Sequence, residues 1–457
     1  MNRLSALYHA KGYMFIALRT EVHGRKVLLK IVQGQITRET IAMDLRPFFG
    51  GLKFKTNLRD GDIIYDSILA GAYAERNGDR LGIGVRPSSN PGGTLFSATT
   101  TAIPRYFPLT GNIFVGNYGS RYSSRYLAGG AISYSPGYGI NLGINGAQGL
   151  PSLTHASVGS QYTQGNLNAN TITPWGNYGF TAGWTHYRIG KIAYPLNPTG
   201  NIFTWGLTGS QLLYGTYQSR WSVNEGYNHV SNQVRVYQSI FAGGYPLTTQ
   251  NYNYFSLGSQ WNSSYDLLDT AGSYGASCTY NQGVNGSHGT LVNGIPSLPA
   301  ARFHYFDATI MVTQPLPLGM SASFTASGQG AFNTLPSQQQ WVLGGFGNLS
   351  AYYPSVLVGD SGYSGRFLVQ SPSWRFHGFR VNGSIYAEVG AVTTTYIAAH
   401  THPWQSLSDV GLGVNISSPW GTTLSALSAV PTGHIHVNKA VLTSNRVYAY
   451  FVLSQNF

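Results

Sequence analysis

From about residue 111 to the end, the chain repeats one pattern of polar and apolar positions. Segments of about eight to twelve residues alternate an apolar or aromatic side chain with Gly, Ser, Thr or Asn, and each ends in a cluster of Gly, Pro, Asn or Ser. In the segment 177–185, Tyr178, Phe180 and Trp184 fall on one face, and small or polar residues fall on the other. This period of two residues predicts β-strands.

Strands with one apolar and one polar face suit either a soluble β-sandwich or a transmembrane barrel. A sandwich buries its apolar faces between two sheets and seldom continues for about 350 residues as a single domain. A transmembrane barrel turns its apolar face to lipid and its polar face to the lumen, and closure leaves no strand edge in the hydrocarbon. The length of the repeat therefore predicts a transmembrane β-barrel.

The composition supports a surface that is not fully in water. Charged residues make up 9% of the chain and aromatic residues 14%, with 32 Tyr and 9 Trp, whereas about a quarter of the residues of a soluble protein are charged. Tyr and Trp form girdles at the two rims of a membrane barrel. No window of about 18 consecutive apolar residues occurs, so the chain has no ordinary transmembrane helix.

The first quarter of the chain has a different chemistry. Residues 1–105 hold 15 of the 27 Lys and Arg and 8 of the 15 Asp and Glu. Their apolar spacing predicts a small α+β region that precedes the barrel. The expected helices are 4–10 and 63–74, and the expected strands are 27–32, 52–54, 81–85 and one from residue 95.

Several kinds of chemistry find no support in the sequence. Beyond residue 105 the basic residues are scattered singly, so the net charge of +12 does not indicate nucleic-acid binding. Cys278 is the single cysteine, which excludes an intramolecular disulfide and a Cys-based zinc site. The His400/His402 and His434/His436 pairs lack an evident third ligand. We expect no metal and no cofactor.

A short motif is similar to that of a serine protease. Residues 359–362 read Gly-Asp-Ser-Gly, and 398–400 read Ala-Ala-His. Trypsin-like proteases place the His before the Ser, whereas His400 follows Ser361, and the residues after Ser361 depart from their pattern. We expect no enzyme activity.

Other stretches together resemble one family. The segments 328–331, 335–345 and 359–363, followed by Arg366, resemble the hemolysin secretion/activation family of two-partner secretion transporters, within the superfamily of POTRA-bearing outer-membrane barrels. Further similar segments are 4–13, 58–101, 116–120 and 409–414.

The resemblance implies an architecture for the whole chain: a 16-stranded antiparallel barrel preceded by small α+β POTRA domains. The implied parts are 1–42, the C-terminal part of a first POTRA domain; 43–105, a second one; and 106–457, the barrel, with an in-turned loop at about 343–365. The 352 barrel residues allow 22 per strand, enough for about 10 spanning residues and a connection. Because Met1 is not followed by an export signal and the front half of the first POTRA domain is absent, we expect further residues before Met1.

The implied function is protein export across the outer membrane of a Gram-negative bacterium. In such transporters the periplasmic POTRA region captures an unfolded exoprotein by its N-terminal secretion domain and passes it through the pore. Besides this large partner, the expected contacts are outer-membrane lipids and the barrel-assembly machinery, with no nucleic acid. A passive diffusion porin and a barrel-assembly factor of the same superfamily are the alternatives.

The resemblance also implies functional residues. At the loop tip, Ser350 stands where the family has an arginine that meets an acidic residue of the barrel wall, so we expect a weaker latch with at most one hydrogen bond to Glu388. Phe457 ends an apolar last strand of the kind that the assembly machinery reads. The implied in-turned loop residues are Gly344, Gly345, Ser350, Tyr352, Gly359, Asp360, Gly362, Tyr363 and Arg366, and the implied wall residues are Glu388 and Gly390.

Overall fold

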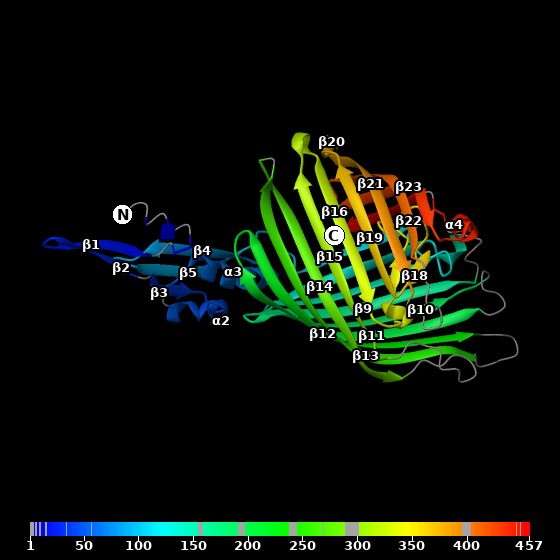
Figure 1. The fold of residues 1–457 in the computed structure, drawn as a ribbon, viewed down its shortest axis with the longest axis horizontal. Helices are drawn as coiled ribbons and strands as arrows, with labels where there is room; N and C mark the ends of the chain where they lie inside the picture. The colour runs from blue at the N-terminus through cyan, green and yellow to red at the C-terminus, as the bar shows by residue number, and fades with distance from the viewer. Residues whose placement is uncertain are drawn as a thin grey trace.

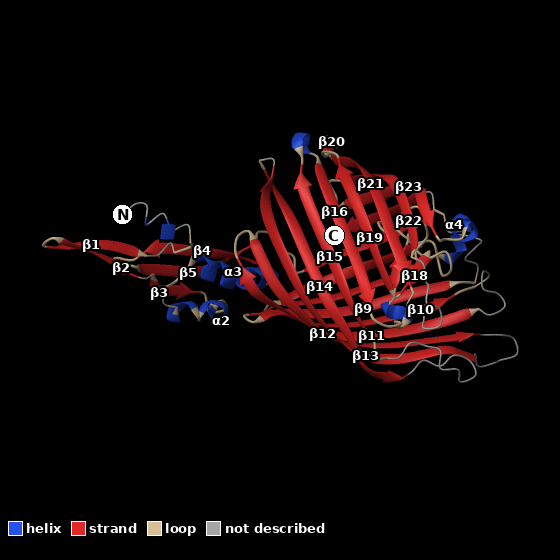
Figure 2. Cartoon of the chain, viewed as in Figure 1, coloured by secondary structure: helices blue, strands red, loops and turns tan. Residues whose placement is uncertain are grey.

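A small N-terminal region projects from one end of a large barrel (Figure 1). The computed structural model describes the chain apart from residues 1–3, 5–6, 9–10, 14–15, 33, 56, 154–158, 191–196, 237–244, 268, 288–300, 395–403, 445 and 448. Strands form almost all of the barrel, and the longest helix of the described chain, α3 (Asp60–Arg76), lies in the N-terminal region (Figure 2). In the described part of the chain, no helix is both long and apolar enough to cross a membrane.

Sixteen antiparallel strands of the described chain close into one barrel, because the last strand, β24, pairs with the first, β6. A short strand, β20 (Trp374–Phe376), adds to the end of β21. The sixteen are β6 (Leu109–Gly116), β7 (Leu127–Gly137), β8 (Ile140–Gly149), β9 (Gln161–Thr173), β10 (Gly176–Arg188), β11 (Pro198–Gly215), β12 (Ser219–Val236), β13 (Tyr245–Leu267), β14 (Thr270–Ser287), β15 (His304–Pro315), β16 (Ser321–Ala331), β19 (Ser361–Gln370), β21 (Phe379–Thr393), β22 (Gln405–Ser417), β23 (Thr422–Ile435) and β24 (Ala449–Asn456).

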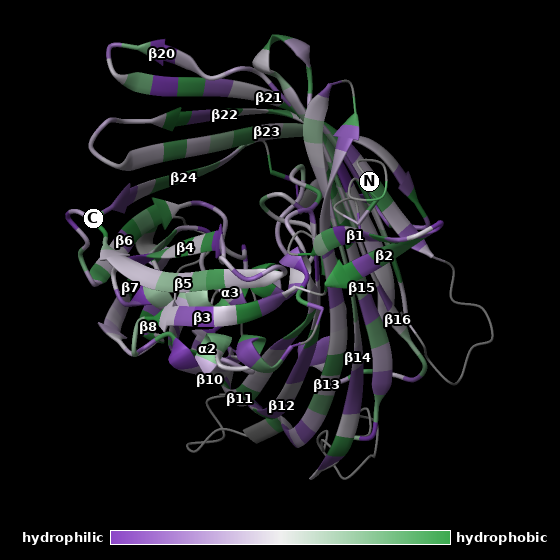
Figure 3. Cartoon of the chain, turned by 90° about the vertical axis from the view of Figure 1, so that its left-hand side faces the viewer, coloured by the Kyte–Doolittle hydropathy of each residue, from purple (hydrophilic) through white to green (hydrophobic). Residues whose placement is uncertain are grey.

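Each strand separates an apolar outer face from a polar inner face, as its alternation predicts. On β10, Phe180 and Trp184 are exposed on the outside. On the inner face of the neighbouring strands, the side-chain amide of Asn166 donates to Asn145 Oδ1 at 2.8 Å. Apolar and polar residues alternate along the strands (Figure 3). The expected transmembrane β-barrel is confirmed.

The two ends of the barrel differ in their connections. At the end that carries the N-terminal region, neighbouring strands are joined by short turns, such as 138–139 and 216–218. At the other end the connections are long, and the longest, 332–360, joins β16 to β19. Short turns on one side and long loops on the other are typical of outer-membrane barrels.

The N-terminal region contains a hairpin and a small α+β unit. The hairpin pairs β1 (Ala17–His23) with β2 (Lys26–Val32), which includes the expected strand 27–32. The unit is a three-stranded sheet in the order β3-β5-β4, with two helices and a 3₁₀ turn beside it. Its elements are β3 (Gln35–Ile41), α2 (Arg46–Phe49), η1 (Leu52–Phe54), α3 (Asp60–Arg76), β4 (Asp79–Pro87) and β5 (Gly93–Ala102).

Two expectations for this region need correction. The expected strand at 52–54 is the 3₁₀ turn η1, because the apolar pair Leu52 and Phe54 is too short a pattern to define a period. The expected division after residue 42 places β3 in the first part, whereas β3 pairs in parallel with β5 of the second. The sheet therefore begins at about residue 35. Most of the expected helix 4–10 lies outside the described residues.

Helix α3 fixes the N-terminal unit to the barrel. Tyr65 donates its hydroxyl to the carbonyl of Leu212 in β11 at 2.5 Å, and Arg76 Nη1 donates to the carbonyl of Gly139 at 2.9 Å. Ile172 of β9 joins the buried core of the unit. The unit is thus held against the short-turn end at two separate places on the barrel rim.

The remaining short helical elements lie in barrel connections. They are η2 (Pro151–Leu153), η5 (Pro317–Gly319), η6 (Ser337–Gln339) and α4 (Lys439–Ser444).

Candidate functional site: a loop held on the inner barrel wall

The loop 332–360 turns back and packs on the inner wall of the barrel. Its hairpin of β17 (Trp341–Leu343) and β18 (Leu357–Gly359) contacts β19 and β21. The loop residues Leu343, Leu349 and Tyr352 form one buried cluster with wall residues of β21, β22 and β23. The wall residues of this cluster are Tyr386, Val392, Leu407, Leu427 and Ala429.

Strand alternation shows that this contact is on the lumen side. On β21, Ile385 and Val389 are exposed, whereas Tyr386 and Glu388 are 4% and 3% exposed. The exposed set faces the membrane, so the buried set faces the lumen, where the loop covers it. The loop 332–360 therefore covers part of the lumen side of the wall.

The bounds of the loop differ from those expected. We expected an in-turned loop at about 343–365, but the chain re-enters the barrel wall at Ser361, the first residue of β19. Gly362, Tyr363 and Arg366 are therefore wall residues, and Tyr363 faces outward, beside Trp404. Residues 361–366 alternate between inward and outward positions, as in the other barrel strands. The family motif alone does not mark the residue at which the loop ends.

The predicted glycines allow the loop to approach the wall. A Cβ on Gly362 would overlap the ring of Trp341, and a Cβ on Gly390 would lie 2.8 Å from Leu343. Gly344 and Gly345 both have positive φ, 98° and 114°, at the start of the loop tip, a conformation that favours glycine. Gly359 closes β18 where a side chain would meet β21.

Main-chain amides hold the tip of the loop to two buried carboxylates. The N–H of Ser350 donates to Glu388 Oε2 at 2.7 Å, and the N–H of Ala351 donates to Asp409 Oδ2 at 2.8 Å. The hydroxyl of Ser350 accepts the N–H of Gly347 instead. Ser350 thus offers Glu388 one hydrogen bond, and the donor is the backbone.

The positive charge beside Glu388 comes from the wall. Arg366 and Glu388 are directly paired across β19 and β21, with Nε 3.3 Å from Oε1. The Nε and Oε1 atoms are within ion-pair distance but are not oriented to form a hydrogen bond. The guanidinium also lies 4.7 Å from the ring centre of Tyr386, which steadies its position.

A second long connection covers the tip from the other side. The residues before β24 contribute the N–H of Val447, which donates to the carbonyl of Ala351 at 2.8 Å. Tyr450 of β24 donates its hydroxyl to the carbonyl of Tyr352 at 2.6 Å. Tyr352 is fully enclosed between these groups and the wall.

The stem of the loop has its own anchor. Asp360 is 1% exposed and accepts the N–H of Leu335 at 2.9 Å and the side-chain amide of Gln340 at 3.2 Å. The side-chain amide of Gln329, on β16, bridges the carbonyls of Gln339 and Asp360, each at 2.8 Å. Asp360 therefore orders the loop locally, apart from the tip.

Sequence reasoning missed three of these contacts. Asp409 was quoted as part of a strand motif, but its position opposite Glu388 depends on the register of β21 and β22. Val447 and Tyr450 lie about a hundred residues from the tip that they hold. One signal in the sequence could have predicted the role of Asp409: it is an acidic residue at an inward position of a predicted barrel strand.

Ser361 of the protease-like motif makes a contact within the loop region of the described chain. Ser361 accepts the N–H of Ala331, and His400 lies outside the described residues together with His402. His434 and His436 are exposed. Among the described residues, no group of three or more His, Cys, Asp or Glu is placed to hold a metal.

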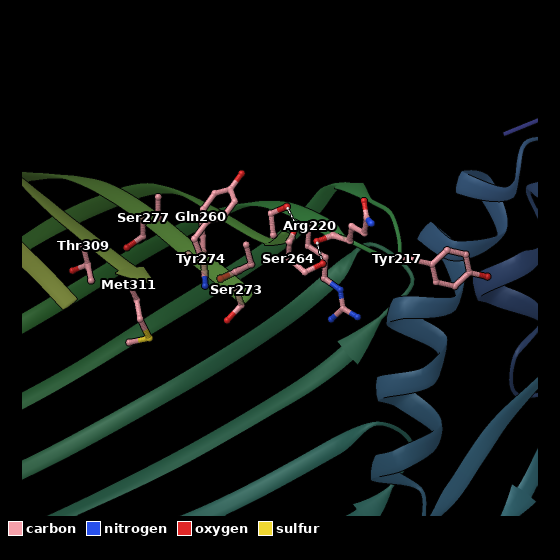
Figure 4. Close-up of a pocket in the computed structure, with 14 residues that line it drawn as sticks. Tyr217, Arg220, Gln260, Ser264, Ser273, Tyr274, Ser277, Thr309 and Met311 are labelled. Carbon is pink, nitrogen blue, oxygen red and sulfur yellow. Dashed lines mark hydrogen bonds between the residues drawn. The ribbon is translucent and has the colours of Figure 1, made fainter. Parts of the chain in front are cut away.

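Another sector of the inner wall is polar and nearly uncharged. A cavity of about 570 Å³ lies against β12 to β15 near the short-turn end (Figure 4). Arg220 is the charged side chain in its lining, and the others are neutral. Polar residues that line it include Gln260, Asn262, Ser264, Ser273, Ser277 and Thr309. Such a surface offers hydrogen bonds without a strong charge preference.

Phe457 lies at the seam that closes the barrel. Its N–H and carbonyl exchange hydrogen bonds with Gly111 at 3.0 and 2.9 Å, and its ring covers this glycine. The side chain is 65% exposed at the short-turn end.

The fold of a closed 16-stranded barrel with a small α+β region is similar to that of several solved structures. CdiB from Escherichia coli has a TM-score of 0.78 and 14% identity, over 100% of this chain and 83% of that chain. CdiB from Acinetobacter baumannii has a TM-score of 0.76 and 16% identity, over 100% and 81%. BamA from Haemophilus ducreyi lacking POTRA domains 1–3 has a TM-score of 0.55 and 14% identity, over 100% and 94%. No protein-family model and no curated protein matches the chain.

Proposed function

We propose that this chain is an outer-membrane translocator of the two-partner secretion type. It would receive an unfolded exoprotein in the periplasm and pass it through the barrel. The observation that carries the proposal is the likeness to the two CdiB structures over the whole chain, at TM-scores of 0.78 and 0.76. CdiB proteins are two-partner secretion transporters.

The placement of the N-terminal unit supports capture of a partner beside the entrance. We assign residues 35–105 to a POTRA domain and the hairpin β1–β2 to the end of a preceding one. The sheet β3-β5-β4 has two edge strands, β3 and β4. An extended peptide can pair with such an edge through main-chain hydrogen bonds, whatever its sequence. We propose that the N-terminal secretion domain of the exoprotein binds there.

The in-turned loop supports a gated pore. Its tip and stem are held by separate groups, so it can leave the wall at the tip while the stem stays ordered. The neutral wall near Gln260 and Asn262 suits the passage of an extended chain of varied sequence. Glu388, Asp409 and Arg366 would hold the closed state.

The proposal places the chain in the outer membrane of a Gram-negative bacterium, with its short-turn end in the periplasm. The apolar outer face would contact lipid, and Phe457, at the seam, would be read by the barrel-assembly machinery. No catalysis or cofactor is assigned.

One second candidate has an observation in its favour. BamA shares the fold over the whole chain at a TM-score of 0.55, which supports a barrel-assembly factor. Such a factor acts on many outer-membrane proteins, so its depletion lowers several barrels together. Loss of one exported protein alone supports the translocator.

The direct test is export of a partner encoded beside the gene. We expect co-expression of the full chain with a large neighbouring protein that has an N-terminal secretion domain to release that protein into the medium. Removal of residues 1–105 should abolish release while the barrel still inserts. Equal release with and without these residues would contradict capture by the N-terminal region. Small-solute passage as the sole activity would favour a porin and contradict the proposal.

A further inference from the structure

A cleft separates the N-terminal unit from the rim of the barrel. It has a volume of about 920 Å³ and lies between the start of α3 and the turn that joins β11 to β12. Basic side chains on one side of it are Lys11, Lys55 and Arg59, and Asp60 and Asp62 also line it. Tyr217 projects from the turn toward α3 (Figure 4).

The barrel side of the cleft belongs to an aromatic girdle. Tyr214, which lines the cleft, stacks on Trp261 at 6.1 Å between ring centres, with the planes 8° apart. Trp221 faces outward beside them and donates its indole N–H to Ser259. Tyr and Trp at the rim of a membrane barrel mark the depth of the lipid headgroups. Tyr214 therefore places one edge of the cleft at the expected depth of the headgroups.

The charges of the cleft leave an excess of one positive charge. Lys55 Nζ pairs with Asp62 Oδ1 at 2.7 Å. Arg59 is bonded to the neutral hydroxyl of Tyr13, and Asp60 accepts the N–H of Gly61. The side-chain ammonium of Lys11 has no hydrogen-bond or ion-pair partner among the described residues. The amino end of the 17-residue α3 adds a partial positive charge at the same place.

We propose that this cleft binds the headgroup of an anionic phospholipid of the periplasmic leaflet. Lys11 and Arg59 would meet the phosphate, and the girdle residues Tyr214 and Tyr217 would contact the glycerol and the upper acyl chains. Two features support a lipid over a soluble anion: Tyr214 of the cleft lining stacks on Trp261 of the outer wall, and Tyr217 adds a second aromatic ring to the barrel side. A bound lipid would brace the N-terminal unit against the barrel beside the Tyr65 contact. The inference requires the barrel to sit in a membrane but does not depend on protein export.

The test uses the full chain, purified and stripped of lipid in a mild detergent. Short-chain phosphatidylglycerol, short-chain phosphatidylcholine and inorganic phosphate are the probes, and native mass spectrometry measures bound probe. The site variant is Lys11→Gln/Lys55→Gln/Arg59→Gln. The matched control, on the hairpin, is Arg25→Gln/Lys26→Gln/Lys30→Gln, which changes the charge of the N-terminal region equally.

We expect phosphatidylglycerol to bind the wild type and the hairpin control alike, and the site variant at least about tenfold more weakly. Phosphatidylcholine should bind weakly to all three. Equal losses in both triple variants, or equal binding of the two lipids, would overturn the inference. Inorganic phosphate that displaces phosphatidylglycerol at equal concentration would show an anion site without lipid recognition, and would also overturn it.

Two further variants keep the test decisive if the triple variant misfolds. Lys11→Gln changes an exposed side chain whose ammonium is unpaired. A heat-sensitive shift in gel migration reports that the barrel of each variant is folded. Weaker phosphatidylglycerol binding by Lys11→Gln, with retention in Lys11→Arg, supports the site. Unchanged binding by Lys11→Gln contradicts it.

Discussion

The tip of the in-turned loop binds two carboxylates through its backbone, and these carboxylates and the neighbouring Arg366 belong to the wall. Ser350 and Ala351 contribute N–H donors, while Glu388, Asp409 and Arg366 lie on three consecutive wall strands. When the tip of the loop leaves the wall, it carries no charged group with it. Release of the tip therefore costs these two hydrogen bonds, those from Val447 and Tyr450, and apolar burial, without separating an ion pair.

This arrangement predicts unequal effects on the two sides of the contact. Glu388→Ala leaves the N–H of Ser350 without its acceptor and the guanidinium of Arg366 without its ion-pair partner, which should weaken the closed loop by about 3 kcal/mol. Ser350→Ala removes a hydroxyl that accepts one internal N–H, with a cost of about 1 kcal/mol. Single-channel recording in planar bilayers should show far more frequent openings for Glu388→Ala. Equal opening by both variants would contradict the backbone latch.

Glycine contacts between the loop and the wall give a second prediction. Gly362→Ala forces the ring of Trp341 away from the wall, at a cost of about 1–3 kcal/mol for overpacking. Gly365 lies on the same strand with its face outward, and an added Cβ there meets Val389 at an ordinary 3.5 Å. Protease digestion of the loop should speed up in Gly362→Ala and not in Gly365→Ala. The reverse order would exclude the packing shown here.

Among the elements, helix α3 couples the N-terminal unit to the barrel and carries a pH-sensitive group. Burial raises the pKa of Asp66 from 3.8 to about 6; Lys55 opposes this shift and Asp62 adds to it. Because the folded-state pKa is the higher one, the protonated carboxyl stabilises the fold. That contribution is complete below about pH 4 and is lost as the pH rises through about 6.

We therefore expect α3 to be more stable at pH 5 than at pH 8, by about 1 kcal/mol after allowance for partial exposure. Asp66→Asn should remove this difference and raise the stability at pH 8. Amide hydrogen exchange of α3 in the full chain, corrected for intrinsic rates, measures the effect. Persistence of the same pH dependence in Asp66→Asn would assign it to another group.

The elements also show what the sequence could predict. Alternation correctly predicted the barrel strands, because one face meets lipid and the other meets the lumen along each of them. The strand expected at 52–54 was wrong, since three residues do not distinguish a strand from a 3₁₀ turn. Glu388 was predicted from a local motif, whereas Asp409, Val447 and Tyr450 reach the loop tip through pairings that no local pattern encodes.

At the scale of the whole molecule, the N-terminal unit, the polar inner wall and the in-turned loop follow one another along the barrel. The N-terminal unit is fixed at the short-turn end, the polar wall near Gln260 begins there, and the in-turned loop descends from the long-loop end. The proposed function requires that the exported chain follow this path through the lumen, without passing along the outer face.

A stalled partner tests this requirement most directly. The exoprotein is fused to a stably folded domain at its C-terminus, and a photoreactive side chain replaces either Gln260 or Leu257, inward and outward neighbours on β13. We predict that the stalled partner cross-links to the photoreactive side chain at position 260 and not to the one at position 257. Cross-linking at 257 alone, or at neither position while export continues, would contradict passage through the barrel.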